Sequence, residues 1–417
     1  MKTTALRNVV LIVACCLAAC GPAATPPPTA APTALPAPSA TAVPAPTATA
    51  APAGPWWQTA VFYEIFVRSF KDSDDDGIGD FNGITAQLDY LQQLGITALW
   101  LMPIHPSPSY HGYDVTDYYG VNADYGTLDD FKNLLAEAHQ RGIKIIIDLV
   151  LNHTSARHPW FQKAVQGDPA YRDWYIWSDK DPGTLGPWNA QAWYRASNGL
   201  FYYAIFWDQM PDLNYDNPAV RAEVNKITAF WLQDMGIDGF RLDAIRYLDE
   251  DGRILADAPT THAFLKEWGA YYRSLNPEAF TVGEVWTSNS NVAPYTQGDE
   301  LTSAFNFDFS LNPDSSYRRA IGGANGAIVN FLLNDMLRYF PQQNNANFLT
   351  NHDMNRAASL AVGTNALDQG KLVSAVLFTL PGIPFVYYGE EIGMTGMKPD
   401  ERLRTPMQWT EDPAKAG

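Results

Sequence analysis

Charged and polar side chains follow several of the apolar, strand-like runs in this chain. Arg241 and Asp243 end the run "IDGFRLD", Glu284 follows "AFTVG", and His352 and Asp353 follow "NANFLTN". A single polar residue at the end of a strand is often a satisfied structural group. Carboxylates, histidines and an arginine that all end strands of one sheet indicate a shared catalytic site. The residues in question are Asp148, Asn152, His153, Arg241, Asp243, Glu284, Asn351, His352 and Asp353.

These side chains suit the hydrolysis of a glycosidic bond. That reaction needs a carboxylate and a carboxylic acid on either side of the bond, and carboxyl groups about 5–5.5 Å apart give retention of the anomeric configuration. Arg241 lies two residues before Asp243, on the same side of the strand, where its charge would keep Asp243 ionised. Val285 and Trp286 give Glu284 a partly apolar setting, which raises a carboxyl pKa toward that of a general acid.

The stretch "DSDDDGIGD", residues 72–80, has the spacing of a calcium loop. Aspartates occupy positions one, three, five and nine, Ile78 occupies position seven, and position six is a glycine. An EF-hand also needs a glutamate at position twelve, where this chain has Gly83, so the loop is not an EF-hand. The spacing alone leaves two interpretations, a metal loop and a solvated acidic turn.

Apolar strand-like runs alternate with amphipathic helical runs from Trp56 onward. The predicted strands are "VFYEIFV", "TALWL", "IKIIIDLV", "IDGFRLD", "AFTVGEVW", "SAFNFDF", "NANFLTNHD" and "GIPFVYYG". Alternation with helices predicts a parallel sheet, and eight such strands predict a closed (β/α)8 TIM barrel, an α/β fold with its chemistry at the carboxyl ends of the strands. Residues 154–215 are too long for a loop and predict a small domain inserted after the third strand.

The composition limits the classes of partner and site. The net charge of −17 argues against nucleic acid and against an anionic membrane surface, because both attract basic proteins. Cysteine occurs only among the first twenty residues, which excludes disulfides and cysteine-based metal sites in the globular part. Aromatic residues make up 13% of the chain and could build core or form platforms for sugar rings. Composition alone does not choose between these two uses.

The first residues of the chain predict export. Residues 1–19 combine a basic start with a short apolar run, as a signal peptide does. The run ends in "LAAC", which resembles the box of bacterial lipoproteins, in which Cys20 would become the lipidated first residue. The linker up to residue 55 consists almost wholly of Ala, Pro and Thr and predicts an extended stalk. We therefore expect residues 20–55 to anchor an extracellular-facing domain to the cell envelope through the lipid.

The strand-end motifs resemble the four signature regions of the α-amylase family of glycoside hydrolases. They are "DLVLNH", "GFRLDAI", "GEVW" and "FLTNHD", and "MPDLN" resembles a fifth region. The resemblance implies that Asp243 is the nucleophile, Glu284 the general acid and then base, and Asp353 the residue that holds sugar hydroxyls and distorts the ring. It also implies substrate contacts for Tyr113 and Asp114 of "GYD", His153, Arg241 and His352.

The resemblance also bears on the acidic loop. The oligo-1,6-glucosidase and neopullulanase-like branches of the family carry a calcium loop after their first strand, where residues 72–80 lie. It therefore implies a structural Ca2+, and oxygen ligands favour calcium over zinc. The implied ligands are the side chains of Asp72, Asp74, Asp76 and Asp80 and the carbonyl of Ile78. A second family calcium uses an asparagine matching Asn152 and an aspartate where this chain has Asn214, a departure that argues against the second site.

Family members continue beyond the eighth strand into a β-sandwich. The present sequence ends soon after "GIPFVYYG", so we expect that C-terminal domain to be missing. The expected organisation is a first part of the barrel over 56–153, an inserted domain B over 154–215, and a second part of the barrel over 216–417.

The resemblance leaves the bond specificity open. The small Ala244 after the nucleophile favours α-1,4 bonds, since enzymes that cut α-1,6 bonds often carry Val there. The α-glucosidases close their pocket with an arginine four residues before "RTPMQW", where this chain has Asp400. We therefore expect a monomeric α-amylase that cuts internal bonds of starch, glycogen and maltooligosaccharides. The alternatives are an exo-acting α-glucosidase, a maltogenic or neopullulanase-like enzyme and, from another class, a non-catalytic carbohydrate-binding relative, against which the three retained carboxylates argue.

Overall fold

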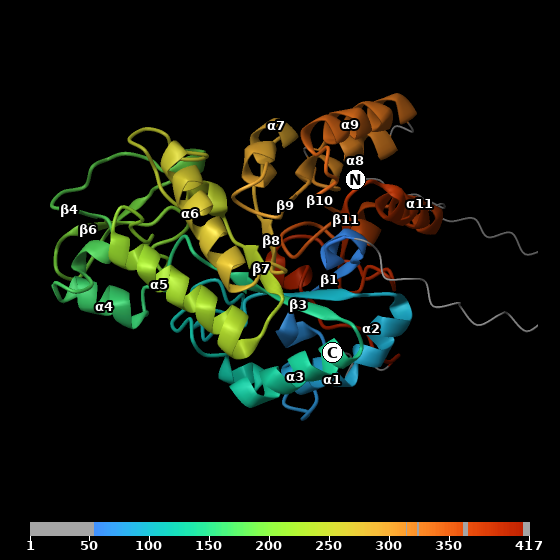
Figure 1. Ribbon diagram of the computed structural model, residues 1–417, viewed down its shortest axis with the longest axis horizontal. Coiled ribbons are helices and arrows are strands. Elements are labelled where there is room, and N and C mark those ends of the chain that lie inside the picture. Colours follow the sequence, from blue (N-terminus) through green and yellow to red (C-terminus); the bar gives the residue numbers. More distant parts are fainter. Residues whose placement is uncertain (1–53, 314, 323–324, 362–365, 412–417) are drawn as a thin grey trace, which may run out of the picture. The chain divides into compact units, whose positions relative to one another are not determined.

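Eight parallel strands close into a barrel in the computed structural model of this chain, which describes residues 54–313, 315–322, 325–361 and 366–411 (Figure 1). Around the barrel the strands follow the order β1-β11-β10-β9-β8-β7-β3-β2. Their bounds are β1 (Phe62–Ile65), β2 (Ala98–Leu101), β3 (Lys144–Leu149), β7 (Gly239–Leu242), β8 (Phe280–Gly283), β9 (Ser303–Phe305), β10 (Asn345–Phe348) and β11 (Ile383–Tyr387). The predicted (β/α)8 barrel is therefore confirmed.

Large apolar side chains fill the interior of the barrel. Phe62 of β1 lies opposite Ala98 of β2 and opposite Phe385 of β11, which closes the sheet on itself. The rings of Phe62 and Phe385 stack with their centroids 4.3 Å apart, and Trp100 and Phe280 belong to the same buried cluster. A barrel filled in this way is a packed core and not a pore, so its chemistry is confined to one end.

Helices connect the strands and cover the outside of the barrel (Figure 1). The helix α3 shows why they form, because Thr127 and Asp130 make a reciprocal capping box at its start and its apolar residues recur at helical spacing on one buried face. The outer helices are α1 (Phe81–Ala86), α2 (Leu88–Leu94), α3 (Leu128–Gln140), α5 (Pro218–Ala229), α6 (Pro259–Leu275), α7 (Asn289–Val292), α8 (Ser316–Gly322), α9 (Gly326–Tyr339), α10 (Ala357–Leu360) and α11 (Ala366–Thr379).

Residues 154–215, which lie between β3 and α5, form the small inserted domain, which we call domain B. It contains α4 (Pro159–Val165) and an antiparallel sheet of β4 (Trp177–Ser178), β5 (Trp193–Arg195) and β6 (Phe201–Tyr203). Phe161 packs against Tyr175, Trp177 and Tyr202, with ring centroids 4.9, 5.7 and 4.9 Å away. Tyr175 and Trp177 of the aromatic run "WYIW" therefore help to build the core of this domain.

Several expectations fall at residues 1–53, outside the described residues. These are the export signal, the lipidated Cys20 and nearly all of the stalk. Among the described residues, no helix has both the length and the apolar character needed to cross a bilayer. Within the part of the chain that the structure describes, which ends at Glu411, no β-sandwich follows β11.

Candidate active site

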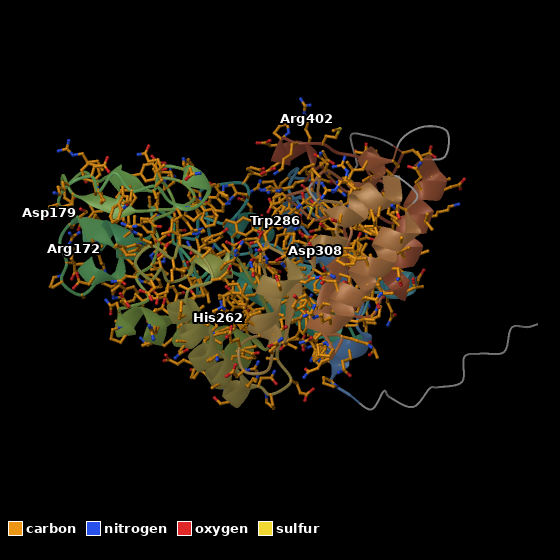
Figure 2. All side chains as sticks on the ribbon, turned by 90° about the horizontal axis from the view of Figure 1, so that it is seen from above. Arg172, Asp179, His262, Trp286, Asp308 and Arg402 are labelled. Carbon is orange, nitrogen blue, oxygen red and sulfur yellow. The ribbon has the colours of Figure 1, made fainter. Side chains whose placement is uncertain are left out.

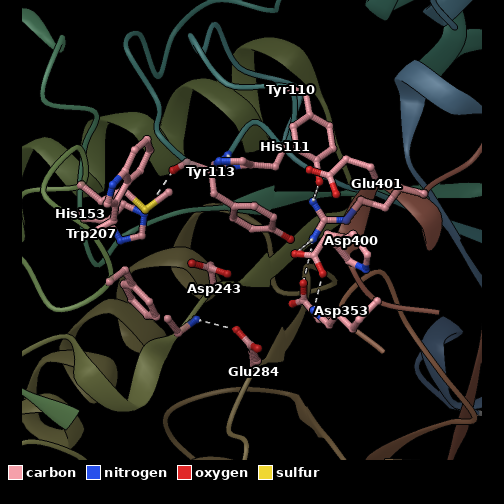
Figure 3. A pocket seen from close by; sticks show the side chains of 16 residues that line it. Tyr110, His111, Tyr113, His153, Trp207, Asp243, Glu284, Asp353, Asp400 and Glu401 are labelled. Carbon is pink, nitrogen blue, oxygen red and sulfur yellow. Dashed lines mark hydrogen bonds and ion pairs between the residues drawn. The ribbon is translucent and has the colours of Figure 1, made fainter. Parts of the chain in front are cut away.

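A pocket of about 610 Å³ opens at the carboxyl ends of the barrel strands (Figure 3). Asp243 follows β7, Glu284 follows β8 and Asp353 lies in the loop after β10, and all three side chains line the pocket. Parallel strands bring their carboxyl ends to one rim, so these residues meet although they lie far apart in the chain. The three predicted catalytic carboxylates therefore share one space.

One buried arginine holds carboxylates that come from three strands. Arg241 Nη1 lies 2.8 Å from Asp148 Oδ1 and 2.7 Å from Asp243 Oδ1, and Arg241 Nη2 lies 3.0 Å from Glu284 Oε2. The side chains of Arg241 and Asp148 are only 1% and 0% exposed, so water screens these pairs weakly. The guanidinium therefore fixes both Asp243 and Glu284 relative to the barrel.

Burial and charge together set the protonation of the two carboxyl groups. Burial raises the pKa of Asp243 to about 6, although the positive charge of Arg241 acts in the opposite direction. Burial also raises the pKa of Glu284 against the effect of Arg241, and the charges of Asp243 and Asp353 raise it further. Asp243 is then mainly ionised at neutral pH. The sequence predicted that the charge of Arg241 would dominate the protonation of Asp243, whereas burial has the larger effect on the pKa of this group.

The backbone after the nucleophile position also contacts the acid. Ala244 takes a left-handed conformation with φ of 49°, an uncommon conformation for a residue with a Cβ atom. From there its N–H donates a 3.0 Å hydrogen bond to Glu284 Oε2. This turn links the loops after β7 and β8, and it fixes the acid relative to Asp243.

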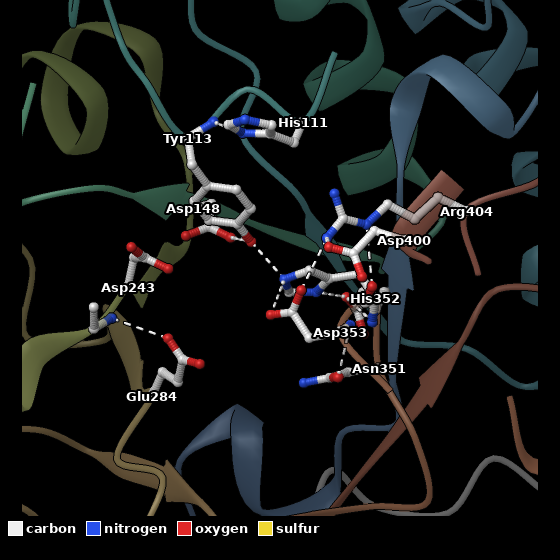
Figure 4. A network of polar contacts seen from close by, with 12 residues as sticks. His111, Tyr113, Asp148, Asp243, Glu284, Asn351, His352, Asp353, Asp400 and Arg404 are labelled. Carbon is white, nitrogen blue, oxygen red and sulfur yellow. Dashed lines mark hydrogen bonds and ion pairs between the residues drawn. The ribbon is translucent and has the colours of Figure 1, made fainter. Parts of the chain in front are cut away.

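Asp353 lies between two cationic side chains (Figure 4). Its Oδ2 lies 3.2 Å from His352 Nε2, and its Oδ1 lies 2.8 Å from Arg404 Nη2. Burial alone would raise the pKa of Asp353, but His352 and Arg404 hold it well below its ordinary value. The carboxylate is therefore ionised over the whole working range of pH and can accept hydrogen bonds from sugar hydroxyls.

The predicted substrate-binding residues divide into two groups. Tyr113 and His153 line the pocket. Arg241, His352 and Asp114 are 1%, 0% and 1% exposed and are not among the lining residues. Arg241 and His352 therefore orient the carboxylates from behind the pocket wall. Asp114 accepts a 2.6 Å hydrogen bond from the hydroxyl of Ser107, and its contact with a sugar stays a prediction.

Sequence reasoning did not single out several residues of the site. Arg404 holds Asp353 and opens the quoted motif "RTPMQW", which served only to locate Asp400. Glu64 contacts His352, and its signal was a lone carboxylate within the apolar run "VFYEIFV".

Exposed aromatic rings extend from the pocket over domain B. Phe206 and Trp207 line the pocket and are 39% and 47% exposed. Trp188 is 61% exposed, and its ring lies 5.6 Å from that of Phe206 and 5.2 Å from that of Tyr247. Open aromatic faces beside a polar pocket are suitable surfaces for sugar rings.

A further open ring lies in the loop after β8. Trp286, two residues after Glu284 and labelled in Figure 2, is 39% exposed. Its ring stacks on that of Phe307 with the centroids 4.6 Å apart. Its carbonyl accepts a 2.7 Å hydrogen bond from Arg246 Nη1. The loop that carries the acid is thus held on both sides.

The acidic loop folds around its own carboxylates. Ligand atoms of Asp72, Asp74 and Asp80 lie within 4.8 Å of one another. The backbone N–H groups of Asp74, Asp75 and Gly77 donate to Asp72, and the hydrogen bond from Gly77 is 2.8 Å long. Asp80 also caps α1 through Gly83. Three carboxylate oxygens at this separation form a donor set that suits a hard cation, whereas the carboxylate of Asp76 lies outside that group. The carbonyl of Ile78 stays a predicted ligand.

The asparagine at position 214 argued against the second calcium site of the family. The structure places that amide elsewhere, because it donates to the Asp173 carbonyl at 3.0 Å. Asn152 lies instead beside Asp212, and Asn152 Oδ1, Asp212 Oδ2 and Glu250 Oε1 are buried atoms without a hydrogen-bond partner. Burial raises the pKa of Asp212 well above its ordinary value, and the charge of Glu250 adds to that effect. The position beside Asn152 and Asp212 therefore keeps oxygen donors, although residue 214 is an asparagine.

Comparison with known proteins identifies relatives of several named activities. Residues 64–417 match the family described as alpha amylase, catalytic domain. The chain is 47% identical over 365 residues to "Alpha-amylase 3" of Dictyoglomus thermophilum, covering 86% of this chain and 69% of that protein. It is 36% identical over 361 residues to "4-alpha-glucanotransferase" of Thermotoga neapolitana, covering 84% and 76%. The solved structure of "Eubacterium rectale Amy13B" superposes with a TM-score of 0.78 at 40% identity, covering 86% and 71%.

Proposed function

Since this chain belongs to the α-amylase family of glycoside hydrolases, we propose that it is an α-amylase that cuts internal α-1,4 bonds of starch, glycogen and maltooligosaccharides with retention. The observation that carries the proposal is the single guanidinium of Arg241 that holds Asp243 and Glu284. Two carboxyl groups that share one guanidinium lie close together, which favours the separation of about 5–5.5 Å that retaining enzymes use over the wider gap that inverting enzymes need for a water.

The chemistry follows from the states of the carboxyl groups. Ionised Asp243 attacks the anomeric carbon, while Glu284 gives its proton to the oxygen of the leaving sugar, so that the C–O bond breaks and a glycosyl ester forms on Asp243. Glu284, now ionised, takes a proton from water, and the resulting attack on the ester releases the sugar and Asp243. Asp353 accepts hydrogen bonds from the hydroxyls of the reacting sugar, and Tyr113 and His153 bound the same space.

The stereochemistry of the first product tests this mechanism. Two successive inversions give the α-anomer, so a proton NMR time course of maltooligosaccharide hydrolysis should show α-product before mutarotation. A control without enzyme gives the rate of mutarotation. If the β-anomer is released first, a single displacement by water has occurred and the assignment of Asp243 as nucleophile is wrong.

The rim of the pocket supports internal cutting. Asp400 lines the pocket and forms ion pairs with Lys398 and Arg404, at the place where an arginine would close the pocket of an α-glucosidase. The open rings of Phe206, Trp207 and Trp188 provide surface for further sugar units on the other side. A chain can then pass beyond both sides of the cleaved bond.

The products of amylose digestion distinguish internal from terminal cutting. We expect mixed maltooligosaccharides early in the reaction and a rapid loss of iodine staining relative to the release of reducing ends. Substrates with a blocked non-reducing end should also be cut at a rate within about tenfold of the unblocked ones, since a missing end contact is worth roughly 1.4 kcal/mol or less. Glucose as the only early product, with blocked substrates resistant, would establish the alternative of an exo-acting α-glucosidase.

The proposal includes a structural Ca2+ at the acidic loop. Asp72, Asp74 and Asp80 would hold it, and the ion would offset the mutual repulsion of the aspartates before α1. The free oxygens of Asn152, Asp212 and Glu250 are donors of the same hard kind and form a second candidate position. Both places lie outside the chemical steps, so the expected role of the ion is to stabilise the fold.

Removing calcium should lower the melting temperature, because binding at 100 times Kd contributes about 2.7 kcal/mol to the folded state. Calorimetry with and without EDTA measures the change. Asp74→Ala should make the loop's part of this response smaller, since Asp74 is exposed and its removal leaves the Asp80 cap of α1 in place. Asp75→Asn is the matched control, because Asp75 lies in the same loop outside the donor group and asparagine tolerates its φ of 66°. If neither EDTA nor added calcium changes the melting temperature, the loop is a solvated acidic turn that binds no ion.

A further inference from the structure

Glu64 is a buried carboxylate that belongs to none of the motifs of the site. It lies on β1, is 2% exposed, and its Oε1 lies 2.5 Å from His352 Nδ1, which comes from the loop after β10. The backbone N–H of His352 also donates to the same oxygen at 3.4 Å. A carboxylate in this place has no solvent to stabilise it, so the imidazole is its main partner.

The other ring nitrogen of His352 also faces oxygen atoms. Nε2 lies 3.2 Å from Asp353 Oδ2 and 2.7 Å from the hydroxyl of Tyr113. A neutral imidazole carries one N–H, whereas the doubly protonated ring donates from both nitrogens. The Tyr113 hydroxyl can in turn donate to Asp148 Oδ2, 3.1 Å away, which leaves its oxygen free to accept from the ring. Carboxylates on both sides of the ring therefore favour the imidazolium.

The charges around the ring come from five parts of the fold. Glu64 faces it from β1, Asp353 from its own loop and Asp148 from β3, while Arg404 donates to the His352 carbonyl at 3.0 Å. Glu390, after β11, adds a further acidic group near Glu64. Burial alone lowers the pKa of His352, but Asp353 and Glu64 outweigh that effect and raise it to about 9. The proton on Nε2 is therefore present below about pH 9 and is lost as the pH rises through that value.

We propose that Glu64 is a positioning residue that keeps His352 doubly protonated, so that the charged ring forms an ion pair with Asp353 and holds that carboxylate in place for the sugar. Glu64 has no contact with the pocket and acts only through the imidazolium. The catalytic consequence rests on the proposed glycosidase function, whereas the protonation state of the ring does not.

The two claims call for two measurements on the whole chain. Proton–nitrogen NMR of protein labelled at histidine reports the protonation of each of the seven rings, and His352→Asn assigns the signal. We expect the His352 ring to remain an imidazolium up to about pH 9 in the unchanged chain. In Glu64→Gln the transition should fall by about 1–3 pH units, the effect of losing an opposite charge at short range. With maltoheptaose, at a pH between the transition of Glu64→Gln and that of the unchanged chain, we expect kcat to fall by about 10- to 100-fold and KM to change little.

A matched variant separates this role from the general loss of a buried charge. Glu391→Gln removes a carboxylate that accepts 2.7 Å hydrogen bonds from Tyr63, the neighbour of Glu64 on β1, and from Tyr90. This variant should leave the His352 transition near pH 9. If it moves that transition as far as Glu64→Gln does, Glu64 has no specific role and the proposal is wrong.

Two further outcomes would overturn the proposal. A ring that is already neutral at pH 7.5 in the unchanged chain contradicts the assignment whether or not Glu64→Gln folds. An unchanged kcat with a neutral His352 in Glu64→Gln would show that the imidazolium does not serve Asp353. If the unchanged chain does not cleave α-glucans at all, the proposed function fails, while the NMR titration still decides the state of the ring.

Discussion

Glu284→Gln should lower kcat on soluble starch by about 10³-fold or more, and Asp243→Asn should lower it further, by roughly 10⁴- to 10⁶-fold. Glutamine cannot give a proton to the leaving oxygen, and asparagine cannot form the glycosyl ester. Both changes keep the shape of a residue that contacts Arg241 or the backbone of Ala244, so the fold should remain. Initial rates of reducing-end release, together with circular dichroism of each variant, measure the two effects.

The two variants should also differ in a way that identifies their roles. Maltosyl fluoride has a leaving group that needs no proton, so Glu284→Gln should regain much of its rate of bond cleavage with this substrate, whereas Asp243→Asn should not. Glu300→Gln is the matched control, because Glu300 is 2% exposed and pairs with His262 outside the pocket. Equal losses on both substrates for both variants would contradict the assignment of acid and nucleophile.

Much of this site was predictable because its residues stand at the ends of regular strands. The period of the apolar runs identified the eight strands, and parallel strands bring their last residues to one rim. Asp243, Glu284 and Asp353 line the pocket at that rim. In the same way, the unusual length of residues 154–215 was enough to predict domain B.

The partners of these residues depend on distances that a single sequence does not contain. Glu64 and His352 are 288 positions apart, and no spacing rule connects them. The aromatic residues of domain B show the same limit, because Trp174 is 8% exposed and Trp188 is 61% exposed although both lie in similar aromatic runs. Trp174 packs against Trp160 and Tyr171, with ring centroids 4.8 and 5.1 Å away, so packing and not residue type decides which ring faces solvent.

Burial also changes the protonation of carboxyl groups, and the adjacent residues in the sequence do not reveal this effect. Arg241 stands two residues before Asp243, which led to the expectation that its charge keeps this carboxyl group ionised. The same arginine also serves Asp148 and Glu284, so its charge is shared among three carboxylates, and desolvation outweighs it at Asp243. The protonation state of the site is thus a property of the whole cluster.

Arg241→Leu should consequently harm both stability and activity. It would leave Asp148, Asp243 and Glu284 buried without their shared cation, and removal of one partner from a buried pair costs about 3–5 kcal/mol. With the guanidinium gone, the pKa of Asp243 should rise above about 6, so the nucleophile would be protonated at neutral pH. Urea unfolding followed by fluorescence, and kcat on maltoheptaose between pH 6 and 9, measure the two losses.

A surface arginine supplies the comparison for this change. Arg141 also pairs with two carboxylates, 2.7 Å from Asp89 and 2.7 Å from Glu137, but its side chain is 27% exposed. Arg141→Leu should therefore change the unfolding midpoint far less than Arg241→Leu and leave kcat unaltered, because water solvates the carboxylates that remain. In Arg241→Leu, raising the pH should restore part of kcat by ionising Asp243, until the loss of the proton from Glu284 opposes the gain. If the unfolding midpoint moves equally in both variants, the buried cluster does not depend on its cation. The conclusion that Arg241 controls the nucleophile would then be wrong.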